Sequence, residues 1–131
     1  KIPVMGHLGL LPQTAKGKFK SKGRSSKEKR QLISDALLLQ NNGVFAIVIE
    51  CVRTSTAKEI TRSLKIPTIG IGSSVFCDGQ VLVTDDLLGL NNSNIRFVKR
   101  FINIKKYINL GLRKFTSEVK LKKYPSKKYS Y

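Results

Sequence analysis

The pattern of apolar and polar segments predicts strands and helices in turn along this chain. Four short, mostly apolar segments are expected to be strands, at residues 3–8, 44–50, 66–72 and 80–83. In the second of them, VFAIVIE, the apolar residues do not alternate with polar ones, so both faces of the strand should be covered. A strand covered on both faces is typical of a parallel sheet in an α/β fold.

The interval between the first two strands begins as a polar, basic loop, at residues 10–31, and continues as a helix. Ser25 or Ser26 is expected to cap this helix, which carries apolar residues at helical spacing to about Asn41. Gly43 follows closely, and a glycine that adopts the left-handed conformation after a helix end is a strong stop signal.

Two further helices are predicted in the remaining intervals. The segment 56–59, TAKE, matches a capping box, in which Thr and Glu side chains bind the first helical amides, and predicts a helix to about Leu64. Helical spacing returns from about residue 95 to residue 121. Residues 122–131 are basic and aromatic, and we expect them to form a loose tail.

The predicted order is therefore β–α–β–α–β–β–α, with crossovers long enough for parallel pairing of the first three strands. A (β/α) barrel and an open, doubly wound sheet both fit this order, although four strands cannot close a barrel of eight. The 131 residues suit a single domain, 1–131. No apolar run approaches the roughly 18 residues of a membrane span.

Composition adds a strong positive charge, with 25 Lys and Arg against 8 Asp and Glu and a net charge of +17. Such a field attracts nucleic acid, anionic lipid or acidic ligands. A nucleotide bias toward codons for Lys, Ile and Asn would produce the same composition without a polyanionic partner. Two cysteines, Cys51 and Cys77, indicate a reducing compartment and inert thiols rather than a disulfide framework.

Polar residues gather where the predicted strands end. His7 ends the first strand, Glu50 the second, Gly70 and Gly72 the third, and Asp85-Asp86 follow the fourth. Sites form at the carboxyl ends of strands in parallel folds. The two glycines lack the rest of a dinucleotide-binding fingerprint and indicate a turn or a close backbone approach. The two aspartates suit a cation, a solvated loop or a helix cap.

Glu50 stands out among these residues because it follows a fully apolar run. Apolar surroundings disfavour the ionised form of a carboxylate, so such a group can exchange a proton near neutral pH. A salt bridge with a neighbouring cation, for instance Arg53, explains the same pattern. A lone His next to an apolar strand is more often a hydrogen-bonded core residue, and a residue of a functional site is the alternative for His7.

Nine segments, in this order, support a more specific interpretation: PVMGHLGLLPQ, KGR, IVIECV, AKEIT, IPTIGIG, CDGQVLV, DLLGL, RFVKRF and YPS. They resemble the C-terminal half of the ketopantoate hydroxymethyltransferase family, over essentially all 131 residues. The sequence departs from the family pattern at three internal positions: Arg53 stands where Pro is usual, Ser74 where Gly is usual and Asp85 where His is usual. The tail also has Lys in place of two acidic residues.

The resemblance implies an α/β fold in which this chain forms strands five to eight of a (β/α)8 TIM barrel of the phosphoenolpyruvate/pyruvate type. It implies transfer of a hydroxymethyl group from 5,10-methylenetetrahydrofolate to 3-methyl-2-oxobutanoate, which gives 2-dehydropantoate in pantothenate synthesis. In the family Mg²⁺ holds the keto acid, and its ligands are expected in the N-terminal half, with no metal ligand in this chain.

By the same resemblance Glu50 is the proton acceptor and His7 lies at the substrate pocket. Because the resemblance covers only the C-terminal half of the family, without its metal-binding residues, we expect an incomplete piece of a cytoplasmic enzyme that is inactive alone and needs its other half-barrel. The lack of an initial Met fits a missing start. The complete enzyme is expected to be a homo-oligomer with no membrane attachment. Two alternatives are an inactive, decayed fragment and a basic nucleic-acid-binding module that uses residues 16–30 and 114–128.

Overall fold

The computed structural model describes residues 2–11, 13, 20–92 and 94–131. Contacts between residues divide the chain into two compact units, residues 1–82 and residues 83–131. We call them the sheet unit and the helical unit and describe each by itself. Lys16 and Lys18 of the predicted basic loop lie outside the described residues.

The sheet unit contains a parallel sheet of strands β1 (Met5–Gly9), β2 (Ala46–Glu50), β3 (Thr68–Ile71) and β4 (Gly79–Gln80). The strands lie in the order β1-β2-β3-β4, so each strand pairs with the next one along the chain. The predicted parallel α/β sheet is confirmed.

The predicted extent of the fourth strand, residues 80–83, is wrong. Pairing with β3 ends at Gln80, after which the Val81 N–H still donates to the Gly70 carbonyl. The physical reason lies in β3, which ends at Ile71. Gly72 then turns away with a φ of +61°, so the residues after Val81 have no strand to pair with.

Two helices connect the strands of the sheet unit. Helix α1 (Ser26–Asn41) is capped as expected by Ser25, whose Oγ accepts a hydrogen bond from the Glu28 N–H at 3.1 Å. Gly43 follows α1 with a φ of +83°, in the left-handed conformation expected of a stop signal.

Helix α2 (Thr54–Ser63) begins two residues before the predicted capping box, so that prediction is wrong. The Thr56 hydroxyl donates instead to the Gly23 carbonyl at 2.9 Å, and the Glu59 carboxylate pairs with Lys29 of α1. Both side chains join α2 to other segments, so neither binds the first turn of its own helix.

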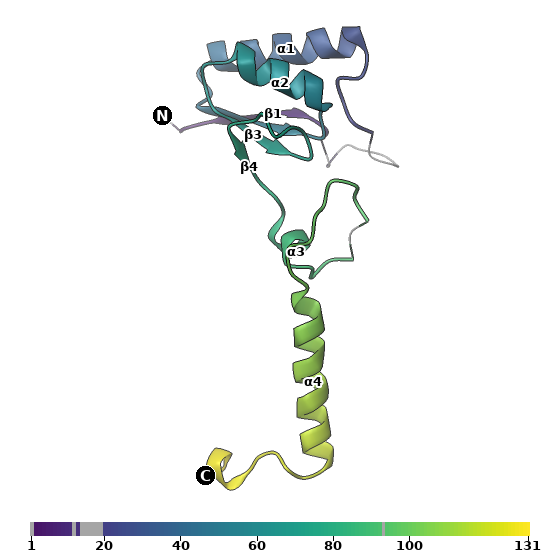
Figure 1. Ribbon diagram of the computed structural model, residues 1–131. Coiled ribbons are helices and arrows are strands. Elements are labelled where there is room, and N and C mark those ends of the chain that lie inside the picture. The colour runs from purple at the N-terminus through teal and green to yellow at the C-terminus, as the bar shows by residue number, and fades with distance from the viewer. Residues whose placement is uncertain (1, 12, 14–19, 93) are drawn as a thin grey trace. The chain divides into compact units, whose positions relative to one another are not determined.

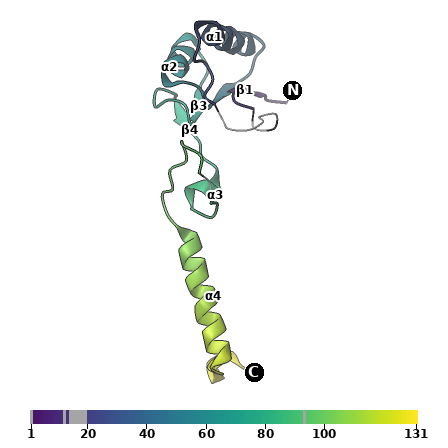
Figure 2. The same cartoon turned by 90° about the vertical axis from the view of Figure 1, so that its right-hand side faces the viewer.

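The hydrophobic core lies between the two helices and one face of the sheet. Leu8, Ile47 and Ile49 project from the strands into a cluster with residues of α1 and α2. The helical members of the cluster are Leu32, Ala36, Ala57 and Ile60. Figures 1 and 2 show α1 and α2 side by side on the same face of the sheet.

The helical unit contains α3 (Thr84–Leu87), α4 (Ile104–Lys120) and the single 3₁₀ turn η1 (Lys127–Tyr129). The predicted helical start at residue 95 is wrong. The Phe101 N–H donates to the Leu87 carbonyl, which ties this segment to α3, and the Asn103 side chain caps α4 by accepting from the Lys106 N–H. No helix among the described residues is long and apolar enough to cross a membrane.

Candidate active site

The parallel register brings His7 and Glu50 to one face of the sheet. His7 of β1 is paired with Val48 of β2, two residues before Glu50. Side chains alternate along a strand, so His7 and Glu50 point away from the face that carries Leu8 and Ile49. The two residues therefore lie on the sheet face opposite α1 and α2.

His7 and Glu50 contact each other directly. His7 Nε2 lies 3.0 Å from Glu50 Oε2, within hydrogen-bond distance. The Glu50 side chain is 15% exposed and that of His7 is 32% exposed, so the pair is largely but not fully removed from solvent. The expected convergence at the strand ends is present for these two residues.

The alternative explanation for Glu50, a salt bridge with Arg53, is not what the structure shows. Arg53 is the N-cap residue of α2 and is exposed. Within the described ranges, no ion pair joins it to Glu50, whose partner is His7.

Backbone contacts fix the position of Glu50. The Leu10 N–H donates to the Glu50 carbonyl at 2.9 Å, and the Cys51 N–H donates to the Ile71 carbonyl at 2.9 Å. Cys51 has a φ of +55°, an uncommon left-handed conformation for a non-glycine residue. The chain therefore turns sharply just after Glu50.

Gly9 is packed directly against this turn. Its φ is +104°, and a Cβ placed on it would lie 2.0 Å from the Glu50 carbonyl oxygen. Only glycine fits there without moving the backbone, because real Cβ atoms do not approach an oxygen so closely.

Ser73 is a residue of this region that sequence reasoning missed. Its hydroxyl donates to the Ile49 carbonyl at 2.8 Å and accepts from the Val52 N–H at 3.1 Å. It thereby spans the turn that contains Glu50 and Cys51. A serine just after a predicted strand is too common to signal such a role, which depends on the β2–β3 register.

The remaining strand-end residues do not join the pair. Gly70 allows close approach, since a Cβ on it would lie 2.8 Å from Gln80 Oε1, and Gly72 makes a turn, as the pattern predicted. Asp85 and Asp86 lie in α3 rather than at the end of β4. Asp86 is buried, and its carboxylate accepts from the Asn91 side chain at 3.4 Å.

Both cysteines are free and buried, as expected for inert thiols. Burial raises the pKa of the Cys51 thiol, and the neighbouring Glu50 charge raises it further. A raised pKa leaves little thiolate at neutral pH, and thiolate is the reactive form.

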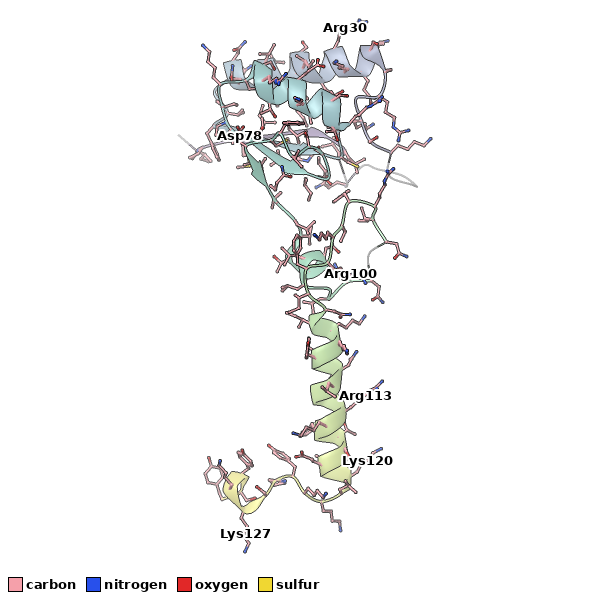
Figure 3. The ribbon with its side chains drawn as sticks, in the orientation of Figure 1. Arg30, Asp78, Arg100, Arg113, Lys120 and Lys127 are labelled. Atoms are coloured by element: carbon pink, nitrogen blue, oxygen red, sulfur yellow. The ribbon has the colours of Figure 1, made fainter. Side chains whose placement is uncertain are left out.

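Asp78 anchors the start of β3. Its Oδ2 accepts from the Thr68 N–H at 2.8 Å and from the Thr68 hydroxyl at 2.9 Å. These hydrogen bonds hold the pKa of the Asp78 carboxyl below its usual value, because they stabilise the ionised form. Figure 3 labels Asp78 beside the sheet.

In the described part of the chain, no three His, Cys, Asp or Glu side chains gather closely enough to hold a metal ion. Mg²⁺ prefers several oxygen ligands in octahedral geometry. The His7–Glu50 pair offers one carboxylate and one imidazole. These residues therefore do not fit a magnesium site by themselves.

Comparison with known proteins identifies the family. The family model described as ketopantoate hydroxymethyltransferase matches residues 1–127. The chain belongs to this family.

Curated members of the ketopantoate hydroxymethyltransferase family align with the whole chain. The 3-methyl-2-oxobutanoate hydroxymethyltransferase of Pelagibacter ubique is 59% identical over 131 residues, which cover 100% of this chain and 51% of that protein. The enzyme of the same name from Bdellovibrio bacteriovorus is 47% identical over 133 residues, covering 99% of this chain and 51% of the relative. The chain thus spans about half the length of the curated relatives it matches.

Proposed function

We propose that this chain supplies half of an enzyme that transfers a hydroxymethyl group from 5,10-methylenetetrahydrofolate to 3-methyl-2-oxobutanoate. Water provides the hydroxyl oxygen, and the products are 2-dehydropantoate and tetrahydrofolate. The observation that carries the proposal is the family match over residues 1–127. The pair of free, buried thiols suits a reducing compartment, so we place the enzyme in the cytoplasm.

We infer that the sheet unit is part of a (β/α)8 barrel, with β1 to β4 as its strands five to eight. Two observations support a barrel. The strands follow one another in sequence order without the reversal of a doubly wound sheet, and both crossover helices lie on one face. The face that carries His7 and Glu50 then corresponds to the barrel interior, and the other four strands would come from the missing half.

Glu50 is the general base in this proposal. The carbon next to the keto group of 3-methyl-2-oxobutanoate must lose a proton before it can form a bond to the one-carbon unit. A carboxylate at a strand end, largely removed from water, is suited to accept that proton. Backbone hydrogen bonds at Glu50 and at Cys51 hold its position during the transfer.

Magnesium and the folate are assigned to no residue of this chain. When bound, Mg²⁺ would polarise the keto acid as a Lewis acid. The described residues do not form its site, so its ligands belong to the other half of the enzyme in our proposal.

The test is a graft. This chain replaces the matching segment of the Pelagibacter ubique relative, and formation of 2-dehydropantoate is measured with and without Glu50→Gln. The graft should turn over, and Glu50→Gln should lower kcat by about 10²–10⁴-fold, the usual contribution of a general base. The isolated chain should have no measurable activity.

Glu59→Gln is the matched control. Glu59 is 48% exposed and pairs with Lys29, so its loss should change kcat less than twofold and leave the thermal unfolding midpoint nearly unchanged. A folded but inactive graft would favour the decayed fragment. Activity of the chain alone would contradict our assignment of the metal site to the other half, and salt-sensitive RNA binding would support the basic binding module.

A further inference from the structure

We propose that His7 is a positioning residue that holds the Glu50 carboxylate through its Nε2–H, in the tautomer that leaves Nδ1 unprotonated. The proposal rests on the role of Glu50 as the base. It assigns different tasks to the two carboxylate oxygens. Oε2 is bound by His7, and Oε1 accepts the substrate proton.

The first step is the direction of the hydrogen bond. His7 Nε2 and Glu50 Oε2 are 3.0 Å apart. An ionised carboxylate can only accept hydrogen bonds, so Nε2 must carry the proton and donate it. The alternative tautomer, protonated on Nδ1, would place a nitrogen lone pair against a carboxylate oxygen.

The second step is the environment of the other ring nitrogen. His7 Nδ1 is a buried atom with no hydrogen-bond partner among the described residues. A proton on Nδ1 would be a buried donor without an acceptor among the described residues, which is unfavourable because the donor loses its hydrogen bonds to water. The Nδ1–H tautomer has such a proton. Of the two tautomers, the one protonated on Nε2 therefore remains.

The third step is the effect on Glu50. Among the described residues, His7 is the hydrogen-bond donor to the Glu50 carboxylate, and it binds Oε2. A hydrogen bond to one oxygen restricts rotation of the carboxylate and so favours one direction for Oε1. A base must lie within about 2.6–3.2 Å of the atom whose proton it takes, which makes this orientation important for the rate.

His7 therefore acts through Glu50 and needs no contact with substrate. This role unites the two interpretations that the sequence left open for His7. The imidazole is hydrogen-bonded and partly buried like a core residue, yet its partner is the base.

The first experiment observes the tautomer directly. This chain is labelled with ¹⁵N and ligated to the unlabelled matching half of the Pelagibacter ubique relative. His7 is the single histidine of the chain, so its ring nitrogens give one set of NMR signals. At neutral pH we expect a protonated Nε2, an unprotonated Nδ1, and an Nε2-bound proton protected from exchange with water. Glu50→Ala should remove that protection.

A proton on Nδ1 would overturn the proposal, whether it belongs to the other tautomer or to an imidazolium. So would an Nε2 proton that exchanges equally fast with and without the Glu50 carboxylate. These readouts do not depend on turnover, so they test the hydrogen bond even where the graft proves inactive and the proposed function fails.

The second experiment measures kinetics in the active graft. His7→Leu removes the donor and should lower kcat by about 10–100-fold with KM nearly unchanged, the range for residues that orient another functional group. His7→Gln places an amide N–H near the former Nε2 and should recover most of that loss. Equal losses in both variants, or a change in KM alone, would show that His7 does not act by donating to Glu50.

Discussion

The sheet unit and the helical unit use apolar side chains in opposite ways. Among the described residues, every buried hydrophobic side chain belongs to the sheet unit, from Leu8 to Cys77. Helix α4 of the helical unit has no buried residue, although Ile108, Leu112, Phe115 and Val119 form an apolar stripe at helical spacing. The sheet unit thus contains its own core, whereas α4 is specified mainly by local signals.

In α4 three basic residues lie on the side away from the apolar stripe. Lys106, Arg113 and Lys120 recur every seven residues, on the side of the helix away from the apolar stripe. Figure 3 shows Arg113 and Lys120 on the same side of α4. The apolar spacing predicted a helix in this region although its own contacts bury little, whereas the cap at Asn103 was not predicted.

The largest expected difference comes from removing core volume. Ile47 of β2 is 0% exposed, and Ile47→Ala should lower the free energy of unfolding by about 2–5 kcal/mol through lost burial and a cavity. Leu112 of α4 is 59% exposed, and Leu112→Ala should change the free energy of unfolding by less than about 0.5 kcal/mol. Urea unfolding of both variants in the graft measures the contrast. Similar losses would mean that the two units do not differ in this way.

The second comparison is between two glycines with positive φ, Gly9 and Gly43. Gly9→Ala should destabilise the sheet unit by about 2 kcal/mol or more, because the left-handed conformation alone costs about 1–2 kcal/mol and the new Cβ meets the Glu50 carbonyl oxygen. Gly43→Ala is the matched control, since its φ is also positive but nothing lies within 4 Å of the new Cβ. An equal effect of the two substitutions would rule out a role for the contact with Glu50.

A glycine inside a helix has the reverse effect. Gly111 lies inside α4, and a Cβ on it would meet nothing within 4 Å. Gly111→Ala should therefore stabilise the helix by about 0.5–1 kcal/mol, since alanine loses less backbone entropy. Amide hydrogen exchange in α4 reports this local gain. Faster exchange in the variant would indicate a contact that requires glycine.

The smallest expected effect is pH-dependent and lies at Asp78. The pKa of its carboxyl is lowered in the folded state, so its stabilisation is present above the unfolded pKa of about 3.9 and is lost as pH falls through the folded value. Asp78→Asn should thus destabilise modestly at pH 7 and have no such effect well below pH 4. Unfolding measured at both pH values checks the sign, and a pH-independent difference would argue against the ionic origin.

Sequence reasoning was accurate where one local signal determined the outcome. Ser25 caps α1, the apolar run 44–50 contains a parallel strand, and Gly72 makes a turn. It was wrong where a side chain had a distant partner. The Thr56 hydroxyl binds Gly23 rather than its own helix, and no local pattern reveals a partner 33 residues away.

The sequence predicted that the residues of the candidate site lie at neighbouring strand ends, but it did not predict which of them are in contact. His7 and Glu50 were expected at the same edge, whereas their contact at 3.0 Å depends on a register in which His7 pairs with Val48. The short helix α3 was missed because four residues are too few to show a period. Asp85 and Asp86 therefore lie in a helical turn and not at a strand end as predicted.

The close approach of Gly9 to the Glu50 carbonyl has a consequence for how this sequence can change. The main chain at Glu50 is held by backbone contacts, and the His7 and Ser73 side chains contact the same turn, so the identities of exposed side chains elsewhere matter little to the placement of Glu50. Substitutions at exposed positions away from this turn should then leave the carboxylate in place. The same few backbone atoms thus fix the end of β2 and leave exposed side chains elsewhere free to vary.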